Sequence, residues 1–347
     1  MRGGEVINKG SYGCVISPNK PCDKTFSGTS GDYVSKIFYG KKGKEDRDRE
    51  WEVLQEIAKI DPEFKFTIEP VDNCNIWNIG GGDVGQCTNK ILVPQIILRN
   101  GGPDLHGFER GLIKPISYKN FLRSFRRLVE GCKKMEEAEL VHRDIKPGNI
   151  LYNEEKNRFY IVDFGLACKT SEVYNKSNEY ILQHVYPYYP PEFRILGYIY
   201  KLGKSDKEIV EYIGYVVKDR KKFKATDIMY DAVKNMIVPG RMGEVDIMEL
   251  IDMHADDVSM FLVELMRSIK NKSFAAFAER ISKRVDIYSL GVTMYYLYDN
   301  DFIEFRDGIQ EESLNFIFKG MTNASPIRRW SAEGVLKKLD QMKGRKN

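Results

Sequence analysis

The sequence contains no run of 18 apolar residues, so it gives no reason to expect a membrane-spanning helix or a membrane partner. The stretch MRGGEVINKGSYG has no apolar segment ahead of a small-residue cleavage site, so no secretory signal is expected. The six cysteines form no C-x-x-C pair and have no nearby histidine, which gives little support for a zinc site. These absences favour reduced thiols and a cytoplasmic location.

The charge balance is also unremarkable for a soluble protein. The formal net charge is only +4, which does not indicate nucleic acid as a main partner. Hydrophobic residues make up 42% of the chain and charged residues 30%, a composition typical of globular domains. A chain of 347 residues is long enough for two units that each have a core.

One short polar stretch, VHRDIKPGNI at residues 141–150, fits neither a helical nor a strand period. A helical pattern of apolar residues precedes it within residues 118–140. Two apolar runs, around 150–152 and 159–162, follow it and flank a polar turn, which predicts a hairpin ending at Asp163. We therefore expect Asp144, Asn149 and Asp163 to come together as an oxygen-rich site that suits Mg²⁺.

These residues carry a specific resemblance. HRDIKPGN and the following DFG resemble the catalytic loop and the metal-binding turn of the eukaryotic-type protein kinase family. The resemblance implies that Asp144 accepts or orients the proton of the substrate hydroxyl and that Lys146 neutralises the γ-phosphate of ATP. It also implies that Asn149 and Asp163 hold the Mg²⁺ that bridges the phosphates.

The N-terminal stretch VINKGSYGCVIS predicts a strand, a turn and a strand. By resemblance, Gly10 and Gly13 let backbone N–H groups approach the phosphates of ATP, and Val15 forms the floor of the adenine pocket. The family has a further glycine where this chain has Asn8, and asparagine tolerates positive φ better than most residues.

The next strand, DYVSKIF, places Lys36 where the family has its phosphate-anchoring lysine. That lysine needs a glutamate on the following helix, which offers Glu50, Glu52 and Glu56. Only Glu50 is followed by apolar residues at both four and seven positions, as in the family. We therefore predict Glu50 as the partner of Lys36.

Residues 91–105, ILVPQIILRNGGPDL, resemble the strand and hinge that connect the two lobes of a kinase. By resemblance, Ile96 lies at the back of the adenine pocket. Leu98 and Arg99 supply backbone hydrogen bonds to adenine.

Pro190-Pro191-Glu192 resembles the family's Ala-Pro-Glu, whose glutamate pairs with an arginine near the C-terminus. The spacing favours Arg329 over Arg328 as that arginine, which suits a buried ion pair. DIYSLGV, which starts at Asp286, resembles the family's helix beneath the catalytic loop, and the resemblance implies that Asp286 accepts hydrogen bonds from backbone N–H groups near His142.

The interval from Glu192 to Asp286 is 94 residues, much longer than the family's. The extra segment, about residues 200–282, has helical apolar periodicity, and SDKE at 205–208 is a capping box. We predict a helical insertion packed on the larger lobe.

The expected fold is therefore α+β and bilobal, with a small β-rich N-lobe at residues 1–98 and a larger, mainly helical C-lobe at residues 99–347. The expected function is an ATP- and Mg²⁺-dependent protein serine/threonine kinase acting on an unidentified protein substrate, since Lys146 is the serine/threonine-type residue. Val185 replaces the threonine that in the family bridges the catalytic Asp and Lys, a departure that bears on efficiency.

Two alternatives remain at this point: a catalytically weak binding scaffold with a kinase fold, and a small-molecule kinase of related shape. The presence of Lys36, Asp144, Asn149 and Asp163 argues against a scaffold, and the Pro-Pro-Glu motif favours a peptide substrate. Asn8, Val185 and the cysteine-containing loops before residue 98 resemble kinases of large DNA viruses of the mimivirus kind. That resemblance implies a location in the host cytoplasm or the virion.

Overall fold

The computed structural model describes most of the chain, and the predictions on Gly10 and Val185 lie outside the described residues. The chain divides into two compact units. We call Met1–Asp104 with Ile150–Ala167 the sheet unit, and Leu105–Asn149 with Cys168–Asn347 the helical unit. The described residues are 5–9, 13–22, 30–39, 41–77, 83–88, 91–175, 182, 186–234, 236 and 246–344.

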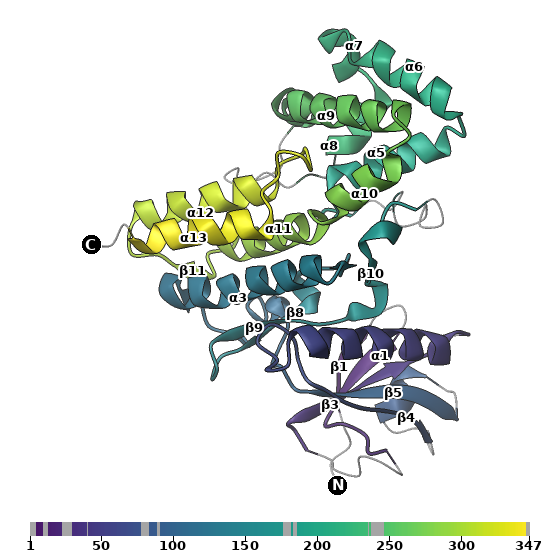
Figure 1. Cartoon of the computed structure of the whole chain (residues 1–347). Coiled ribbons are helices and arrows are strands. Elements are labelled where there is room, and N and C mark those ends of the chain that lie inside the picture. The colour runs from purple at the N-terminus through teal and green to yellow at the C-terminus, as the bar shows by residue number, and fades with distance from the viewer. Residues whose placement is uncertain are drawn as a thin grey trace. The chain divides into compact units, whose positions relative to one another are not determined.

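The sheet unit is built on five antiparallel strands in the order β1-β2-β3-β5-β4 (Figure 1). Its central strands β3 and β5 are rich in valine and isoleucine, which pack well on a pleated surface. A second pairing, β8 with β9, forms the hairpin that the sequence predicts. The strands are β1 (Glu5–Lys9), β2 (Gly13–Ser17), β3 (Tyr33–Phe38), β4 (Pro70–Trp77), β5 (Leu92–Arg99), β8 (Ile150–Asn153) and β9 (Arg158–Ile161).

Helix α1 (Gly43–Ile60) packs against β3, β4 and β5 and buries Glu50, Leu54 and Ile57. The buried carboxylate of Asp61 follows it and accepts hydrogen bonds from the backbone N–H groups of residues 65–67, at 2.8–3.0 Å. This turn also joins the hairpin to the rest of the sheet unit, because the Ile161 amide donates to the Phe66 carbonyl at 2.8 Å.

Two disulfides cross-link the sheet unit, contrary to the expectation of reduced thiols. Cys14 of β2 is bonded to Cys87 of α2 (Asp83–Cys87), and Cys22 is bonded to Cys74 of β4. Their Cα–Cα distances of 6.1 and 5.9 Å lie in the range that a disulfide spans. The partners are 73 and 52 residues apart, so only the folded sheet brings them together.

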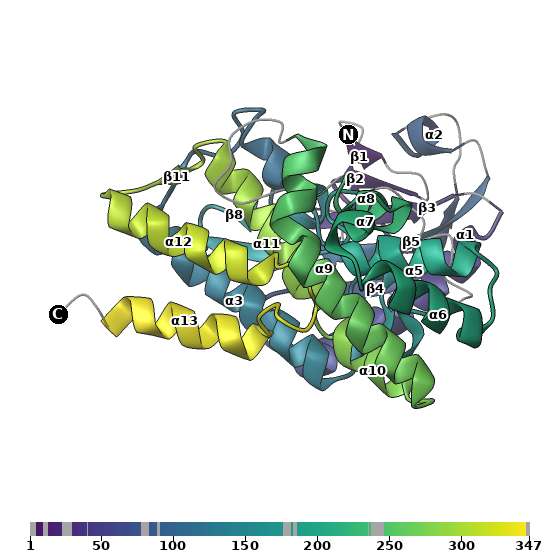
Figure 2. The ribbon, with the colours of Figure 1, turned by 90° about the horizontal axis from the view of Figure 1, so that it is seen from above.

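The helical unit is organised around α3 (Tyr118–Glu137) and α11 (Val285–Asp299), which contact each other. Helices α12 and α13 pack beside them, α12 on α11 and α13 on α3 (Figure 2). None of the helices in the described ranges is long and apolar enough to span a membrane. The other elements are η1 (Leu105–Gly107), β6 (Ile116–Ser117), β7 (Leu140–Val141), η2 (Pro147–Asn149), η3 (Phe164–Leu166, in the sheet unit), β10 (Cys168–Lys169), η4 (Thr170–Glu172), β11 (Ile303–Glu304), α12 (Gly308–Met321) and α13 (Ala332–Gly344).

The described part of the long interval before α11 is mainly helical, as predicted. Its central helix α9 contacts α6, α7, α8 and α10, and α8 contacts α5 (Figure 2). One continuous apolar core joins these helices to the residues around Phe193, so the insertion is part of the helical unit. The Ser205–Glu208 capping box is present at the start of α6. These helices are α5 (Pro191–Lys201), α6 (Asp206–Val216), α7 (Arg220–Lys224), α8 (Asp227–Val233), α9 (Ile247–Lys270) and α10 (Phe274–Ser282).

A fully buried ion pair joins the start of α5 to the segment before α13. The Arg329 guanidinium donates to both carboxylate oxygens of Glu192, at 2.7 and 2.8 Å, and also to the Arg284 and Asn323 carbonyls. The bidentate geometry and the extra acceptors satisfy charges that would be costly to bury alone. The structure thus confirms Arg329, rather than Arg328, as the partner of Glu192.

Replacing Cys14 and Cys87 together with alanine should lower the free energy of unfolding by about 2–4 kcal/mol, because the unfolded chain regains the freedom that the cross-link removes. Denaturant titration measures this change. Adding a dithiol reductant should destabilise the parent in the same direction, and Cys168→Ala, which removes a cysteine outside both disulfides, should retain the parent's response to reductant. A parent whose stability is indifferent to reductant contradicts the prediction.

Removing Arg329 should be among the more damaging single changes in the helical unit. Arg329→Met leaves the Glu192 carboxylate buried without its counter-ion, so we expect a loss of about 3–5 kcal/mol in the free energy of unfolding. The matched control is Lys337→Met, which breaks an exposed ion pair with Glu333 and should leave the unfolding midpoint unchanged. Equal midpoints for Arg329→Met and the control would show that the pair contributes nothing.

Candidate active site

The polar loop 141–150 is held in the helical unit by the N-terminal end of α11. The carboxylate of Asp286 accepts hydrogen bonds from the backbone amides of His142, at 2.8 Å, and Arg143, at 3.0 Å. This confirms the structural role predicted for Asp286. Arg143 has a φ of 64°, a left-handed conformation that non-glycine residues seldom adopt, and the two hydrogen bonds help to hold it there.

Burial, which penalises the charged form, raises the pKa of Asp286 from its usual 3.8 to about 6, with the two amide hydrogen bonds opposing the shift. The carboxylate therefore ionises below neutral pH and can act as a charged acceptor at pH 7. Its two amide partners provide the charge-assisted hydrogen bonds that a buried carboxylate needs.

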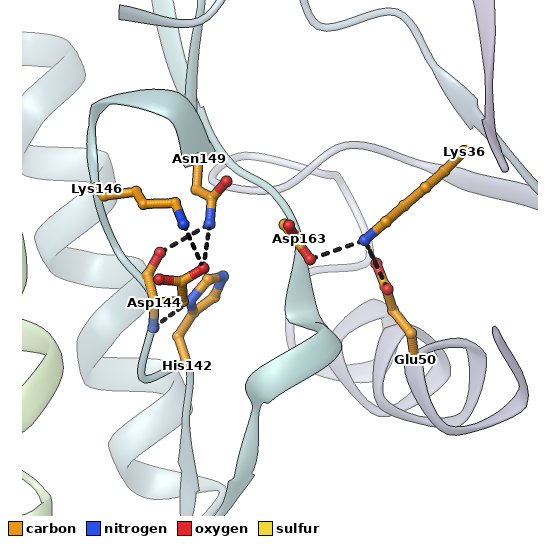
Figure 3. Close-up of polar contacts among 7 residues, drawn as sticks. All are labelled: Lys36, Glu50, His142, Asp144, Lys146, Asn149 and Asp163. Carbon is orange, nitrogen blue, oxygen red and sulfur yellow. Dashed lines mark hydrogen bonds and ion pairs between the residues drawn. The ribbon is translucent and has the colours of Figure 1, made fainter. Parts of the chain in front are cut away.

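Asp144 lies at the centre of a compact cluster inside the same unit (Figure 3). Lys146 Nζ and Asn149 Nδ2 each lie 2.9 Å from Asp144 Oδ2, and Asn149 Nδ2 also donates to the Asp144 carbonyl at 2.9 Å. The Asp144 amide donates to His142 Nδ1 at 3.2 Å. These contacts fix the carboxylate relative to the lysine ammonium, as general-base or proton-orienting chemistry requires.

Lys36, Glu50 and Asp163 form a second cluster, entirely within the sheet unit (Figure 3). Lys36 Nζ lies 2.6 Å from both oxygens of Glu50 and 2.7 Å from Asp163 Oδ1. Of the three glutamates that the helix offers, Glu50 is thus the one that Lys36 contacts, as predicted. Asp163 has a φ of 68°, so it too is held in a left-handed conformation.

Electrostatics keep this lysine charged. Burial acts against the ammonium, but the attraction of Asp163 and Glu50 outweighs it and raises the pKa of Lys36 above its ordinary value. Burial also raises the pKa of Glu50 to about 7, with Lys36 as the main opposing influence. The Lys36 ammonium, held by two carboxylates, is therefore a positive charge in a fixed position that could bind a phosphate group.

Four residues predicted to contact ATP lie in one row across the sheet. Asn8 pairs with Val15, Val15 with Lys36, and Lys36 with Ile96. Residues directly opposite each other on neighbouring strands point to the same face, so this row gathers the predicted nucleotide side chains with Lys36. Their role in ATP binding stays a prediction.

The other residues of the sheet predicted to contact ATP, Gly13, Leu98 and Arg99, are engaged in close backbone contacts with neighbouring segments. A Cβ at Gly13 would collide with the Ile37 carbonyl oxygen, so the β2–β3 pairing itself requires glycine there. The Arg99 amide donates to the Glu69 carbonyl at 2.9 Å, and Leu98 pairs with Val34 of β3.

Asn149 and Asp163 offer the donor types that Mg²⁺ prefers, an amide oxygen and a carboxylate. The amide nitrogen of Asn149 donates to Asp144, so its oxygen is the atom that points away from that aspartate (Figure 3). The Asp163 side chain is 43% exposed. Each residue, taken within its own unit, therefore fits the role of a magnesium ligand.

The sequence interpretation missed Tyr186, whose ring centroid lies 5.7 Å from Lys146 Nζ. Burial and then the charge of Asp144 raise the pKa of the Tyr186 hydroxyl, which keeps the side chain neutral. The tyrosines of YPYYP were the available signal, because an aromatic ring can hold a lysine ammonium.

The pKa of Asp286 gives a testable pH dependence. The folded state holds this proton up to about pH 6 and the unfolded state releases it near 3.8, so the stabilising contribution of protonated Asp286 is present below about 3.8 and lost as the pH rises through 6. Relative to Asp286→Asn, the unfolding free energy of the parent should fall by roughly 3 kcal/mol at most between pH 4 and 7. Denaturant titrations of both proteins across this range measure the difference. A constant gap between them would refute the prediction.

Comparison with known proteins gives an independent result. Residues 102–201 match the protein kinase domain family, a span that includes the 141–150 loop and the Asp163-Phe164-Gly165 turn. A mitogen-activated protein kinase, mpkC, of Emericella nidulans is 43% identical over 94 residues, 27% of this chain and 21% of that protein. The cell division cycle 7-related protein kinase of Homo sapiens is 33% identical over 61 residues, covering 18% of this chain and 11% of that protein. A probable serine/threonine-protein kinase, fnkB, of Dictyostelium discoideum is 29% identical over 83 residues, covering 24% and 16%.

The chain thus matches at most about a fifth of the length of each of these relatives. Together with the five-stranded sheet unit and the mainly helical remainder, the family match identifies the fold as the bilobal α+β fold of protein kinases. The similarities support a protein kinase of the eukaryotic-type superfamily.

Proposed function

We propose that this chain is an ATP-dependent protein serine/threonine kinase that transfers the γ-phosphoryl group of ATP to hydroxyl groups of a protein substrate. The observation that carries the proposal is the Asp144 cluster, in which one carboxylate is held by Lys146 and Asn149 at 2.9 Å. Phosphoryl transfer needs positioning and charge neutralisation more than covalent chemistry, and this cluster offers both.

Each group has a specific task in this reaction. Asp144 accepts a hydrogen bond from the substrate hydroxyl and orients it for attack. It takes the proton as the new oxygen–phosphorus bond forms, while the bond between the γ-phosphorus and the β-phosphate oxygen breaks and ADP leaves. Lys146 places its ammonium beside the oxygens of the transferred group, where negative charge gathers. Lys36, fixed by Glu50, holds the remaining phosphates of the nucleotide.

Magnesium, when bound, neutralises the negative charge of the phosphates. We assign its ligands as Asn149 and Asp163, which carry the hard oxygen donors described above. The serine/threonine preference rests on Lys146 and on the serine/threonine kinases to which the chain is similar.

The test is transfer of labelled phosphate from ATP, with Mg²⁺, to a generic basic protein. The parent should label serine or threonine, and Asp144→Asn should lose on the order of three or more powers of ten in rate, as enzymes do when a catalytic group is removed. Phosphoamino-acid analysis identifies the acceptor residue. The matched control is Asp256→Asn, which removes an exposed aspartate of α9 paired with Arg220 and should retain the parent's rate.

The outcomes separate the alternatives. Equal labelling by the parent and Asp144→Asn would reject the proposed role of the loop. A parent that binds ATP but labels no protein, under conditions where a reference kinase does, would favour the binding scaffold. Label on a small molecule alone would favour the small-molecule kinase.

A further inference from the structure

The ammonium of Lys146 lies between two partners in the helical unit. Its Nζ is 2.9 Å from Asp144 Oδ2, and the centroid of the Tyr186 ring is 5.7 Å away. The face of an aromatic ring attracts a cation within about 6 Å, most strongly where water is partly excluded. Tyr186 is half-buried, so its ring can attract Lys146 while leaving the ammonium's N–H groups to donate elsewhere.

Helix α11 fixes the distance between this ring and the lysine. Ser289 Oγ donates to the Tyr188 carbonyl at 2.8 Å, two residues beyond the ring. Thr293 Oγ1, which donates to the Ser289 carbonyl at 2.7 Å, also lies 3.4 Å from the carbonyl of Ile145, next to Lys146. The two segments therefore contact successive turns of one buried helix, and the segment of Tyr188 cannot shift without losing its hydrogen bond to Ser289.

A series of ring contacts also supports Tyr186. Its centroid lies 5.3 Å from that of Tyr189, which lies 5.2 Å from Phe193, which lies 5.4 Å from Tyr174. The Tyr174 hydroxyl in turn donates to the Glu192 carboxylate of the buried ion pair at 3.3 Å. We call these four rings the aromatic ladder; it ties the ring over Lys146 to the rigid Glu192–Arg329 pair.

We propose that Tyr186 is a positioning residue, whose ring holds the ammonium of Lys146 against Asp144 in the geometry that phosphoryl transfer requires. This inference rests on the proposed function and deepens it. The side chain of the preceding residue, Val185, has no hydroxyl or other donor that could hydrogen-bond to a catalytic group. The contact acts on Lys146 and through it on the transferred group, not on the binding of the nucleotide.

The first test compares three substitutions at this position. Tyr186→Phe keeps the ring and should keep kcat within about twofold of the parent. Tyr186→Leu and Tyr186→Gln remove the ring and should lower kcat by about 3- to 30-fold, the range that a cation–π contact corresponds to. The KM for ATP should stay within about twofold in all three, since Lys146 is not assigned to ground-state binding.

The chain offers a matched control in Tyr215, an exposed tyrosine of α6 whose ring centroid lies 5.4 Å from Lys222 Nζ. Tyr215→Leu removes a contact of the same kind on the insertion and should leave kcat unchanged. If Tyr186→Phe loses as much activity as Tyr186→Leu, the ring face is not what acts, and the proposal is wrong. A full rate in both ring-less variants overturns it equally.

A double-mutant cycle separates positioning from general packing. In a Lys146→Met background, Tyr186→Leu should cause no further loss of kcat, because the ring then has no cation to hold. A further loss equal to that seen in the parent background would mean that the ring acts independently of Lys146 and would overturn the proposal.

Hydrogen–deuterium exchange of peptides from residues 142–149 measures the effect of the Tyr186 contact on the loop independently of catalytic activity. Exchange should quicken in Tyr186→Leu and stay at the parent's rate in Tyr186→Phe and Tyr215→Leu. An inactive parent with this exchange pattern would reject the proposed function and retain the contact. An active parent whose loop exchange and kcat are both indifferent to the ring would reject the contact and retain the function.

Discussion

The carboxylate of Asp286 is the point on which the candidate active site depends. It is buried at the start of α11, and two backbone amides of the polar loop donate to it, one of them from a residue in a left-handed conformation. A buried carboxylate is costly unless its acceptor capacity is used, so any loop conformation that withdraws these amides is disfavoured. The same helix also donates a hydrogen bond to the segment that carries Tyr186 and contacts the carbonyl that precedes Lys146. Helix α11 thus contacts the segments that carry Asp144, Lys146 and Tyr186, and so helps to set their relative positions.

The insertion enlarges the apolar core against which the aromatic ladder packs. Phe193 and Tyr174 lie in the same apolar cluster as Phe261 and Phe277 of α9 and α10, so the rings nearest Glu192 are packed by insertion helices. Close packing leaves such rings little freedom to reorient. The insertion therefore helps to keep the residues before α5 rigid and does not form a separate domain.

The sequence predicted those features that depend on residues close together in the chain. It failed for contacts between distant segments that the resemblance did not relate. The α3 periodicity, the β8–β9 hairpin and the Ser205 capping box are local patterns, and all are present. Glu50 and Arg329 were reached through spacing learned from a resemblance. The disulfides and the Tyr186 contact were missed because each is created by the fold: no spacing rule relates Cys14 to Cys87, or a tyrosine to a lysine 40 positions earlier.

A ring and a hydroxyl would hold a lysine in different ways. A hydroxyl forms a directional hydrogen bond and uses one of the donors or acceptors of its partner. An aromatic face attracts the whole ammonium through its quadrupole and uses none of its three N–H donors. Lys146 over Tyr186 can therefore donate to Asp144 and still offer N–H groups to phosphate oxygens. A cation–π contact is less directional than a hydrogen bond. The contacts of α11 and the aromatic ladder compensate for this, because they fix where the ring lies.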